Sequence, residues 1–211
     1  MKNFVSIITM CLFFLHSPAI VHAQSPQKNT SANSSHNDDA TVLSKALAYF
    51  SSKKYHEALI LFRQLTSRYT LNARYIAFYA TCCYYEWQFT AAAELYSSAL
   101  PKLGGLAPHE LSFYNWACAE SYFNEKDYTA AIPYYIKMLG LCYSNERHDA
   151  HFKLGFCYYF LGINNIAEVH FKQAYDYYCT LDTSDTWKSR RAQLKNMING
   201  LENSKANGHD S

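Results

Sequence analysis

Apolar residues between Thr41 and Leu181 recur at positions i, i+3, i+4 and i+7, the spacing that gathers side chains on one face of an α-helix. Turn-like polar breaks interrupt this pattern about every 15 residues. No stretch alternates apolar and polar residues in the way a half-buried strand does. The sequence therefore predicts an all-α chain of helices joined by short turns.

A short motif occurs four times in this region with the same internal spacing. The copies are Tyr55-x-x-Ala58-x-x-x-Phe62-x-x-Leu65, Phe89-x-x-Ala92-x-x-x-Tyr96-x-x-Ala99, Tyr128-x-x-Ala131-x-x-x-Tyr135-x-x-Met138 and Asn164-x-x-Ala167-x-x-x-Phe171-x-x-Ala174. A small residue also recurs in the helix that precedes each copy, at Ala46, Ala80, Ala119 and Gly155. Small side chains let two antiparallel helices approach closely, and aromatic side chains fill the space between neighbouring pairs.

This pattern resembles the tetratricopeptide repeat, whose helix pairs stack into a right-handed α-solenoid. The resemblance implies four repeats, over residues 39–72, 73–106, 112–145 and 148–181. The early Trp and the closing Pro of the family are replaced by other residues in all four copies. Residues 182–202 are amphipathic, which predicts a capping helix with a solvated basic face that includes Arg190, followed by a flexible tail over 203–211.

The first 23 residues have the order of a secretory signal peptide. Lys2 precedes an apolar run from Phe4 to Leu15, which is too short to span a bilayer. Small Ala23 is the expected last residue removed, so the mature chain would begin at Gln24 and be periplasmic or secreted, without a stable membrane span. Residues 24–38 are polar, which predicts a disordered linker.

The charge balance, the cysteines and the lack of catalytic motifs limit the classes of function that the sequence supports. The chain has 19 basic and 17 acidic residues, so nucleic acid is not an expected partner. Six cysteines follow Ala23, all within or at the end of predicted helices, where buried free thiols are expected more often than disulfides. His148 and His151 are three residues apart, but no third metal ligand accompanies them. With no catalytic motif either, we expect no enzyme activity, metal or cofactor.

The first helix of each repeat carries a second row of apolar and aromatic residues beside its packing row. In the tetratricopeptide family the first helices line the concave side, so the resemblance implies that about half of this row packs between helices and half faces a groove. The row also contains Leu43, Leu47, Phe50 and Phe160, with Lys153 among its few polar neighbours. The candidate groove residues are Phe78, Tyr84, Tyr85, Phe113, Trp116, Glu120, Phe123, Phe152, Phe156 and Tyr159.

Two functions fit this row of aromatic residues. The first is a non-catalytic interaction module or scaffold that binds an apolar or aromatic peptide segment of another protein. The second is a structural protein that associates with itself through the same aromatic surface.

Overall fold

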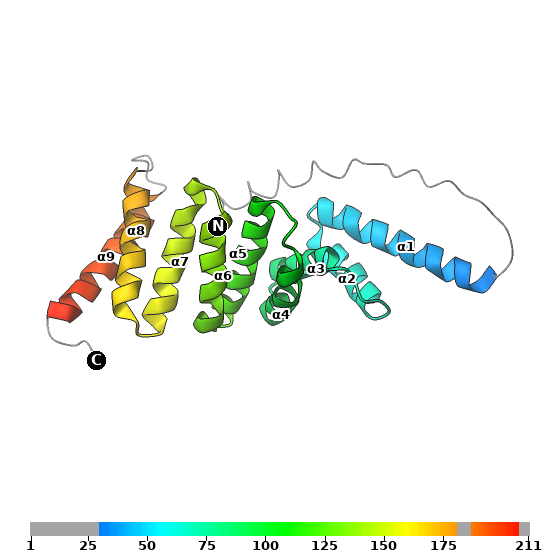
Figure 1. The fold of residues 1–211 in the computed structure, drawn as a ribbon, viewed down its shortest axis with the longest axis horizontal. Helices are drawn as coiled ribbons and strands as arrows, with labels where there is room; N and C mark the ends of the chain where they lie inside the picture. Colours follow the sequence, from blue (N-terminus) through cyan, green and yellow to red (C-terminus); the bar gives the residue numbers. More distant parts are fainter. Residues whose placement is uncertain (1–29, 181–186, 207–211) are drawn as a thin grey trace. The chain divides into compact units, whose positions relative to one another are not determined.

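The computed structural model describes residues 30–180 and 187–206, and all regular structure in these two ranges is helical (Figure 1). The chain divides into two compact units, Met1–Lys102 and Leu103–Ser211. The described part of the first unit contains α1 (Thr30–Ser51), α2 (Tyr55–Thr66), α3 (Ala73–Tyr85), α4 (Phe89–Ala99) and the 3-10 helix η3 (Leu100–Lys102). The described part of the second contains α5 (Pro108–Asn124), α6 (Tyr128–Leu141), η4 (Ser144–Glu146), α7 (Arg147–Phe160), α8 (Asn164–Thr180) and α9 (Lys188–Ala206).

Consecutive helices form antiparallel pairs. In the first unit α1 packs on α2 and α3 packs on α4, with α2 in contact with α3. In the second unit α5 packs on α6, α6 on α7, α7 on α8, and α8 on the last helix, α9. The predicted all-α architecture of four helix pairs and a capping helix is confirmed.

The turn inside each pair has one backbone geometry in all four repeats. One residue of each turn has a positive φ of 59° to 74°: Lys53, Trp87, Lys126 and Gly162. The next residue donates its N–H to the carbonyl five residues earlier, through the bonds Lys54 to Tyr49, Gln88 to Cys83, Asp127 to Tyr122 and Ile163 to Tyr158, each 2.9–3.0 Å long. Three of the four positive-φ positions are not Gly, so the repeated packing imposes a left-handed conformation that costs an L-residue about 1–2 kcal/mol.

Small residues allow the two helices of a pair to cross closely. Ala46, Ala80 and Ala119 are fully buried on the first helices of their pairs, and Gly155 occupies the same place on α7. A Cβ on Gly155 would lie less than 3.0 Å from the ring of Phe171 on α8. That ring is itself fully buried and cannot move aside freely.

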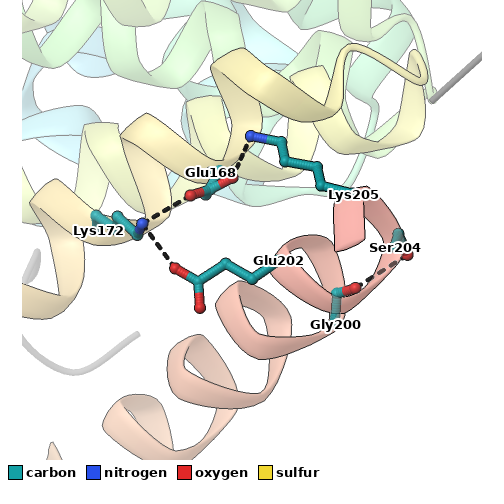
Figure 2. Close-up of polar contacts among 6 residues, drawn as sticks. All are labelled: Glu168, Lys172, Gly200, Glu202, Ser204 and Lys205. Carbon is teal, nitrogen blue, oxygen red and sulfur yellow. Dashed lines mark hydrogen bonds and ion pairs between the residues drawn. The ribbon is translucent and has the colours of Figure 1, made fainter. Parts of the chain in front are cut away.

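Two buried acidic side chains hold the outer helices in place. Asp39 of α1 accepts hydrogen bonds from Arg68 at 2.9 Å and from the Tyr69 hydroxyl at 2.5 Å. Figure 2 shows the other network, in which Glu168 of α8 accepts from Lys172 and from Lys205 of α9, both at 2.6 Å. These two hydrogen bonds hold the pKa of the Glu168 carboxyl below its ordinary value. Asp39 thus links α1 to the segment that follows α2, and Glu168 links α8 to α9.

The capping helix buries one face and exposes the other. Leu194, Ile198 and Leu201 of α9 are buried in one core cluster with Phe171 and Tyr178 of α8. Lys172 also forms an ion pair with Glu202 of α9 at 2.8 Å (Figure 2). An amphipathic helix with a polar outer face covers the apolar side that a terminal repeat would otherwise expose.

The ends of the chain differ from the expected boundaries. Helix α1 begins at Thr30, inside the segment 24–38 expected to be a linker, because a helix anchored by Asp39 adds one backbone hydrogen bond for each further residue. Helix α9 continues to Ala206, beyond the expected boundary at 202. The predicted signal peptide 1–23, the cleavage site at Ala23 and Gln24, residues 182–186 and residues 207–211 lie outside the described residues.

Replacing Gly155 by Ala tests the close helix crossing. We expect Gly155→Ala to lower the free energy of unfolding by about 1–3 kcal/mol, because the added methyl group overlaps the Phe171 ring. Chemical denaturation measures this difference. Gly200→Ala is the matched control, since nothing lies within 4 Å of a Cβ at that site in α9; it should raise the stability by about 0.5–1 kcal/mol. A Gly155→Ala protein as stable as the wild type would contradict the assigned crossing.

Candidate interaction site

Helices α5 and α7 are the first helices of the two pairs in the second unit, and they carry most of the predicted site residues. Their members follow one another at helical intervals of three or four residues, so each set lies on one side of its helix. The set on α5 is Phe113, Trp116, Glu120 and Phe123, and the set on α7 is Phe152, Phe156 and Tyr159. We call the six aromatic residues of these two sets the aromatic face.

Exposure divides the aromatic face into two classes. Phe113 and Phe152 retain only 9% and 6% of their surface and therefore serve the packing of the unit. Trp116, Phe123 and Phe156 are half-buried. Tyr159 is 40% exposed at the end of α7. Four aromatic residues on two first helices therefore keep surface that a partner could contact.

Ring contacts hold the aromatic face in a fixed arrangement along α7. Phe152 meets Phe156 at 5.0 Å between ring centroids, and Phe156 lies 5.9 Å from Phe160. Phe156 also meets Phe171 of α8 edge-on at 5.0 Å. On α5, Phe113 and Trp116 lie 5.9 Å apart. Such geometries stabilise aromatic pairs beyond simple burial.

Phe160 belongs to this arrangement although it was outside the selected set of site residues. Its ring stacks on Tyr128 of α6 at 4.7 Å and lies 6.4 Å from Phe123. Phe123 in turn meets Tyr128 at 5.4 Å. These rings join the end of α5, the start of α6 and the end of α7. The helical interval Phe152, Phe156, Phe160 was the sequence signal for this role.

Glu120 connects the core to the surface of the second unit. Its carboxylate accepts a 2.5 Å hydrogen bond from the buried Tyr135 hydroxyl and a 2.8 Å hydrogen bond from Lys153 of α7. The Lys153 ammonium also lies 4.2 Å from the centroid of the Phe123 ring. One oxygen of Glu120 therefore accepts the hydrogen bond of a buried hydroxyl, and the other holds the Lys153 ammonium beside the aromatic face.

The second helix of each pair carries a buried aromatic ring at the helix crossing, and the residue that this ring contacts on the first helix depends on whether the ring is Tyr or Phe. Tyr96 and Tyr135 have hydroxyl groups, and they meet Thr81 at 2.8 Å and Glu120 at 2.5 Å. Phe171 has no hydroxyl group. It contacts Phe156, which occupies the position on α7 that Glu120 occupies on α5. A buried hydroxyl needs a hydrogen-bond partner, which explains why a carboxylate occurs in an otherwise apolar row.

Arg190 of the capping helix differs from its expected solvated position. Its guanidinium lies 3.9 Å from the centroid of the Phe152 ring, and the residue is half-buried. The neighbouring Arg191 donates to the Tyr178 carbonyl oxygen at 3.3 Å. Because Arg190 stacks on the Phe152 ring, it contributes to the packing of α9 on the rest of the unit.

Three predicted site residues belong to the first unit and form contacts of their own. Phe78 stacks on Phe50 at 4.5 Å, and Tyr85 stacks on Tyr55 at 4.2 Å with nearly parallel rings. Tyr84 meets Tyr85 edge-on at 5.3 Å. Burial raises the pKa of Tyr85 to about 12. Phe78, Tyr84 and Tyr85 thus have ring contacts within their unit and are half-buried, as Trp116 is, and a single groove through all four repeats stays a prediction.

Comparison with solved structures identifies the fold. The chain is similar to MamA, a tetratricopeptide-like protein: one structure of MamA from AMB-1 has a TM-score of 0.62 at 14% identity, covering 83% of this chain and 85% of that one. A second from AMB-1 has a TM-score of 0.59 at 15% identity, covering 82% and 90% of the two chains. MamA from MSR-1 has a TM-score of 0.54 at 13% identity, covering 81% and 98%.

The fold is that of a tetratricopeptide-like protein. No model of a known protein family matches the chain, and no curated protein matches it. Of the helices in residues 30–180 and 187–206, none combines the length and the apolar character needed to cross a bilayer.

Two histidines meet inside the last helix pair of this tetratricopeptide-like fold. Nδ1 of His151 on α7 lies 2.9 Å from Nδ1 of His170 on α8, and the His170 ring stacks on Tyr158 at 5.5 Å. Burial, with smaller effects of His170 and Arg147, lowers the pKa of His151 to about 4. Burial also lowers the pKa of His170. His170 was not among the residues considered from the sequence, where His151 was paired with His148.

The His148 ring packs among aromatic side chains. Its ring stacks on Tyr177 at 4.6 Å and meets Trp187 edge-on, and burial lowers its pKa. Within the described residues, no group of three or more His, Cys, Asp or Glu side chains is arranged to hold a metal ion.

The six cysteines of the described region are free thiols. Cys82, Cys83, Cys118 and Cys157 are buried, and burial raises the pKa of Cys83 to about 11 and that of Cys157 to about 12. High pKa values keep these thiols protonated and unreactive at neutral pH. Cys179, at the end of α8, is exposed, unlike the buried position expected for it.

The histidine pair predicts an acid-sensitive stability. Because the folded pKa values of His151 and His170 lie below the ordinary 6.5, the unfolded chain binds more protons as the pH falls from about 6.5 towards about 4. Their contribution to stability is therefore complete above pH 6.5 and is lost below it. We expect the free energy of unfolding, measured in urea, to decrease less between pH 7 and pH 5 in His151→Gln than in the wild type. An equal decrease in both proteins would contradict the assignment of this pH dependence to the histidine pair.

Proposed function

We propose that this chain is a non-catalytic protein-interaction module that binds an apolar or aromatic peptide segment of another protein on the aromatic face of α5 and α7. The observation that carries the proposal is the set of four aromatic side chains, Trp116, Phe123, Phe156 and Tyr159, that remain partly exposed on neighbouring first helices. Helix-repeat folds present extended surfaces of this kind to their partners.

The residue types on this face suit binding. Trp and Tyr supply much of the binding energy at protein interfaces when a partner covers them. The ring contacts of Phe156 fix its orientation before any partner arrives, which lowers the entropy lost on binding. An apolar or aromatic segment would therefore gain contacts with a surface that is already ordered.

The cations beside the aromatic face do not favour an acidic peptide. Lys153 is paired with Glu120 at 2.8 Å, and Arg190 covers the Phe152 ring. The Glu120 carboxylate offsets the charge of Lys153, so an acidic segment gains little net attraction beside it. The Glu120–Lys153 pair is better suited to orient the backbone of an apolar segment by hydrogen bonds at the edge of the rings.

Export of the chain is the second part of the proposal. The basic residue, apolar run and small residues of the first 23 positions support removal of a signal peptide after Ala23 and a periplasmic or secreted mature protein. N-terminal sequencing of the chain recovered outside the cytoplasm should read from Gln24. An intact Met1 on that material would refute the proposed processing.

Trp116→Ala tests the binding face. Synthetic peptides of two compositions, apolar-aromatic and acidic, serve as probes, with affinity measured by fluorescence anisotropy. We expect the wild type to prefer the apolar-aromatic set. Trp116→Ala should weaken the tightest complex at least tenfold, because loss of such an anchor removes about 1.4 kcal/mol or more.

Trp87→Ala is the matched control for this experiment. Trp87 is 77% exposed in the turn between α3 and α4 and is not part of the aromatic face. Its replacement should leave the affinity unchanged, and circular dichroism checks that both variants stay helical. Equal binding by folded Trp116→Ala and wild type, or a preference for the acidic peptides, would overturn the proposal.

A further inference from the structure

The turn between α7 and α8 concentrates exposed apolar side chains in the second unit. Five large apolar residues in this short stretch expose 37–54% of their surface: Phe160, Leu161, Ile163, Ile166 and Val169. We call these five residues the turn patch. Ile163, Ile166 and Val169 follow one another at intervals of three, so they lie on one side of the first turns of α8.

The corresponding turn of the preceding pair has the opposite character. Between α5 and α6, the exposed residues are Asn124, Glu125, Lys126 and Asp127. The two turns share the same backbone hydrogen bonds, so the backbone does not require apolar side chains at this place. The apolar character of the turn patch therefore has a cause other than the fold.

Ile163 occupies a position where a polar residue would stabilise the helix. Its carbonyl accepts the first helical bond of α8, from Ala167 at 3.0 Å, which makes it the N-cap. Asp127, the N-cap of α6, accepts a side-chain hydrogen bond from Ala130 at 3.0 Å. Ile is among the least favourable N-cap residues. Ile163 forgoes capping and still leaves 38% of its surface exposed.

The turn patch is free of charge. No charged residue occurs from Tyr159 to Ala167, and the next one, Glu168, is turned towards Lys172 and Lys205. A patch without charges offers nothing to attract an acidic or basic partner. Its five side chains can, however, lie against the same five of a second copy across a two-fold axis without bringing like charges together.

The area of the patch fits a weak dimer. Taking roughly 200 Å² as the full surface of a large apolar side chain, the turn patch and the adjoining Tyr159 expose about 500 Å² per chain. A two-fold contact would bury about 1,000 Å² in total, the lower limit for a specific interface. Interfaces at this low end of the size range are typical of weak, transient complexes.

We propose that the turn patch is the contact surface of a weak two-fold homodimer of this chain. The contact would cover the turn patch and the adjoining Tyr159 of each copy with the same residues of the other. This inference goes beyond the peptide-binding function, because the five residues of the turn patch are not part of the aromatic face, although Phe160 contacts its members Phe123, Phe156 and Tyr159.

Ile163→Asp tests the dimer without endangering the fold. Asp places a good N-cap at the start of α8, so the thermal midpoint should rise while the added charge opposes the two-fold contact. In sedimentation velocity of the full chain, from about 1 to 200 µM, we expect the wild type to dimerise. The dissociation constant of Ile163→Asp should be at least tenfold higher. The apolar run Phe4–Leu15 is common to all proteins compared, so a difference between them reports on the substituted position.

Ile136→Asp is the control, because Ile136 of α6 is also 50% exposed and lies outside the turn patch. It should dimerise as the wild type does. A wild type that stays monomeric throughout, or equal association of the wild type and Ile163→Asp, would overturn the proposal. So would a monomeric wild type whose turn patch binds phosphatidylcholine vesicles in an Ile163-dependent manner. Peptide binding by Ile163→Asp, measured at concentrations at which the wild type is monomeric, should be unchanged, so this proposal and the peptide-binding function fail in different experiments.

Discussion

Close crossing of two antiparallel helices is the constraint on which the rest of this molecule depends. It requires a small residue on the first helix, as at Gly155, and a buried ring on the second, as at Phe171. Phe62, Tyr96 and Tyr135 occupy the equivalent place in the other pairs, all fully buried. Once this crossing is repeated, the turn between the helices has little freedom, and even Trp87 adopts a left-handed conformation.

The choice of ring at the crossing has consequences for the surface. A Phe needs only apolar neighbours, whereas a Tyr brings a hydroxyl that must be satisfied inside the core. Tyr135 is satisfied by Glu120, and that carboxylate then holds Lys153 beside the exposed rings of α5 and α7. Core chemistry thus decides which polar groups a partner would meet on the aromatic face.

Packing and binding compete for the same aromatic residues in this fold. Phe113 and Phe152 are buried, whereas Tyr159 keeps 40% of its surface exposed. Exposed apolar surface is otherwise kept small in soluble proteins, because it favours association. The aromatic side chains that stay partly exposed after the helices have packed are therefore the ones for which packing alone gives no explanation.

The sequence by itself determined the helices, their pairing and the small and aromatic residues at each crossing, because helical periodicity and a repeated motif are local properties. It also marked the row that contains Trp116 and Phe156. Only the tertiary structure decided which members of that row are buried, since burial depends on neighbouring helices. The contacts of His151 with His170 and of Arg190 with Phe152 join residues far apart in the chain, and no local pattern specifies them.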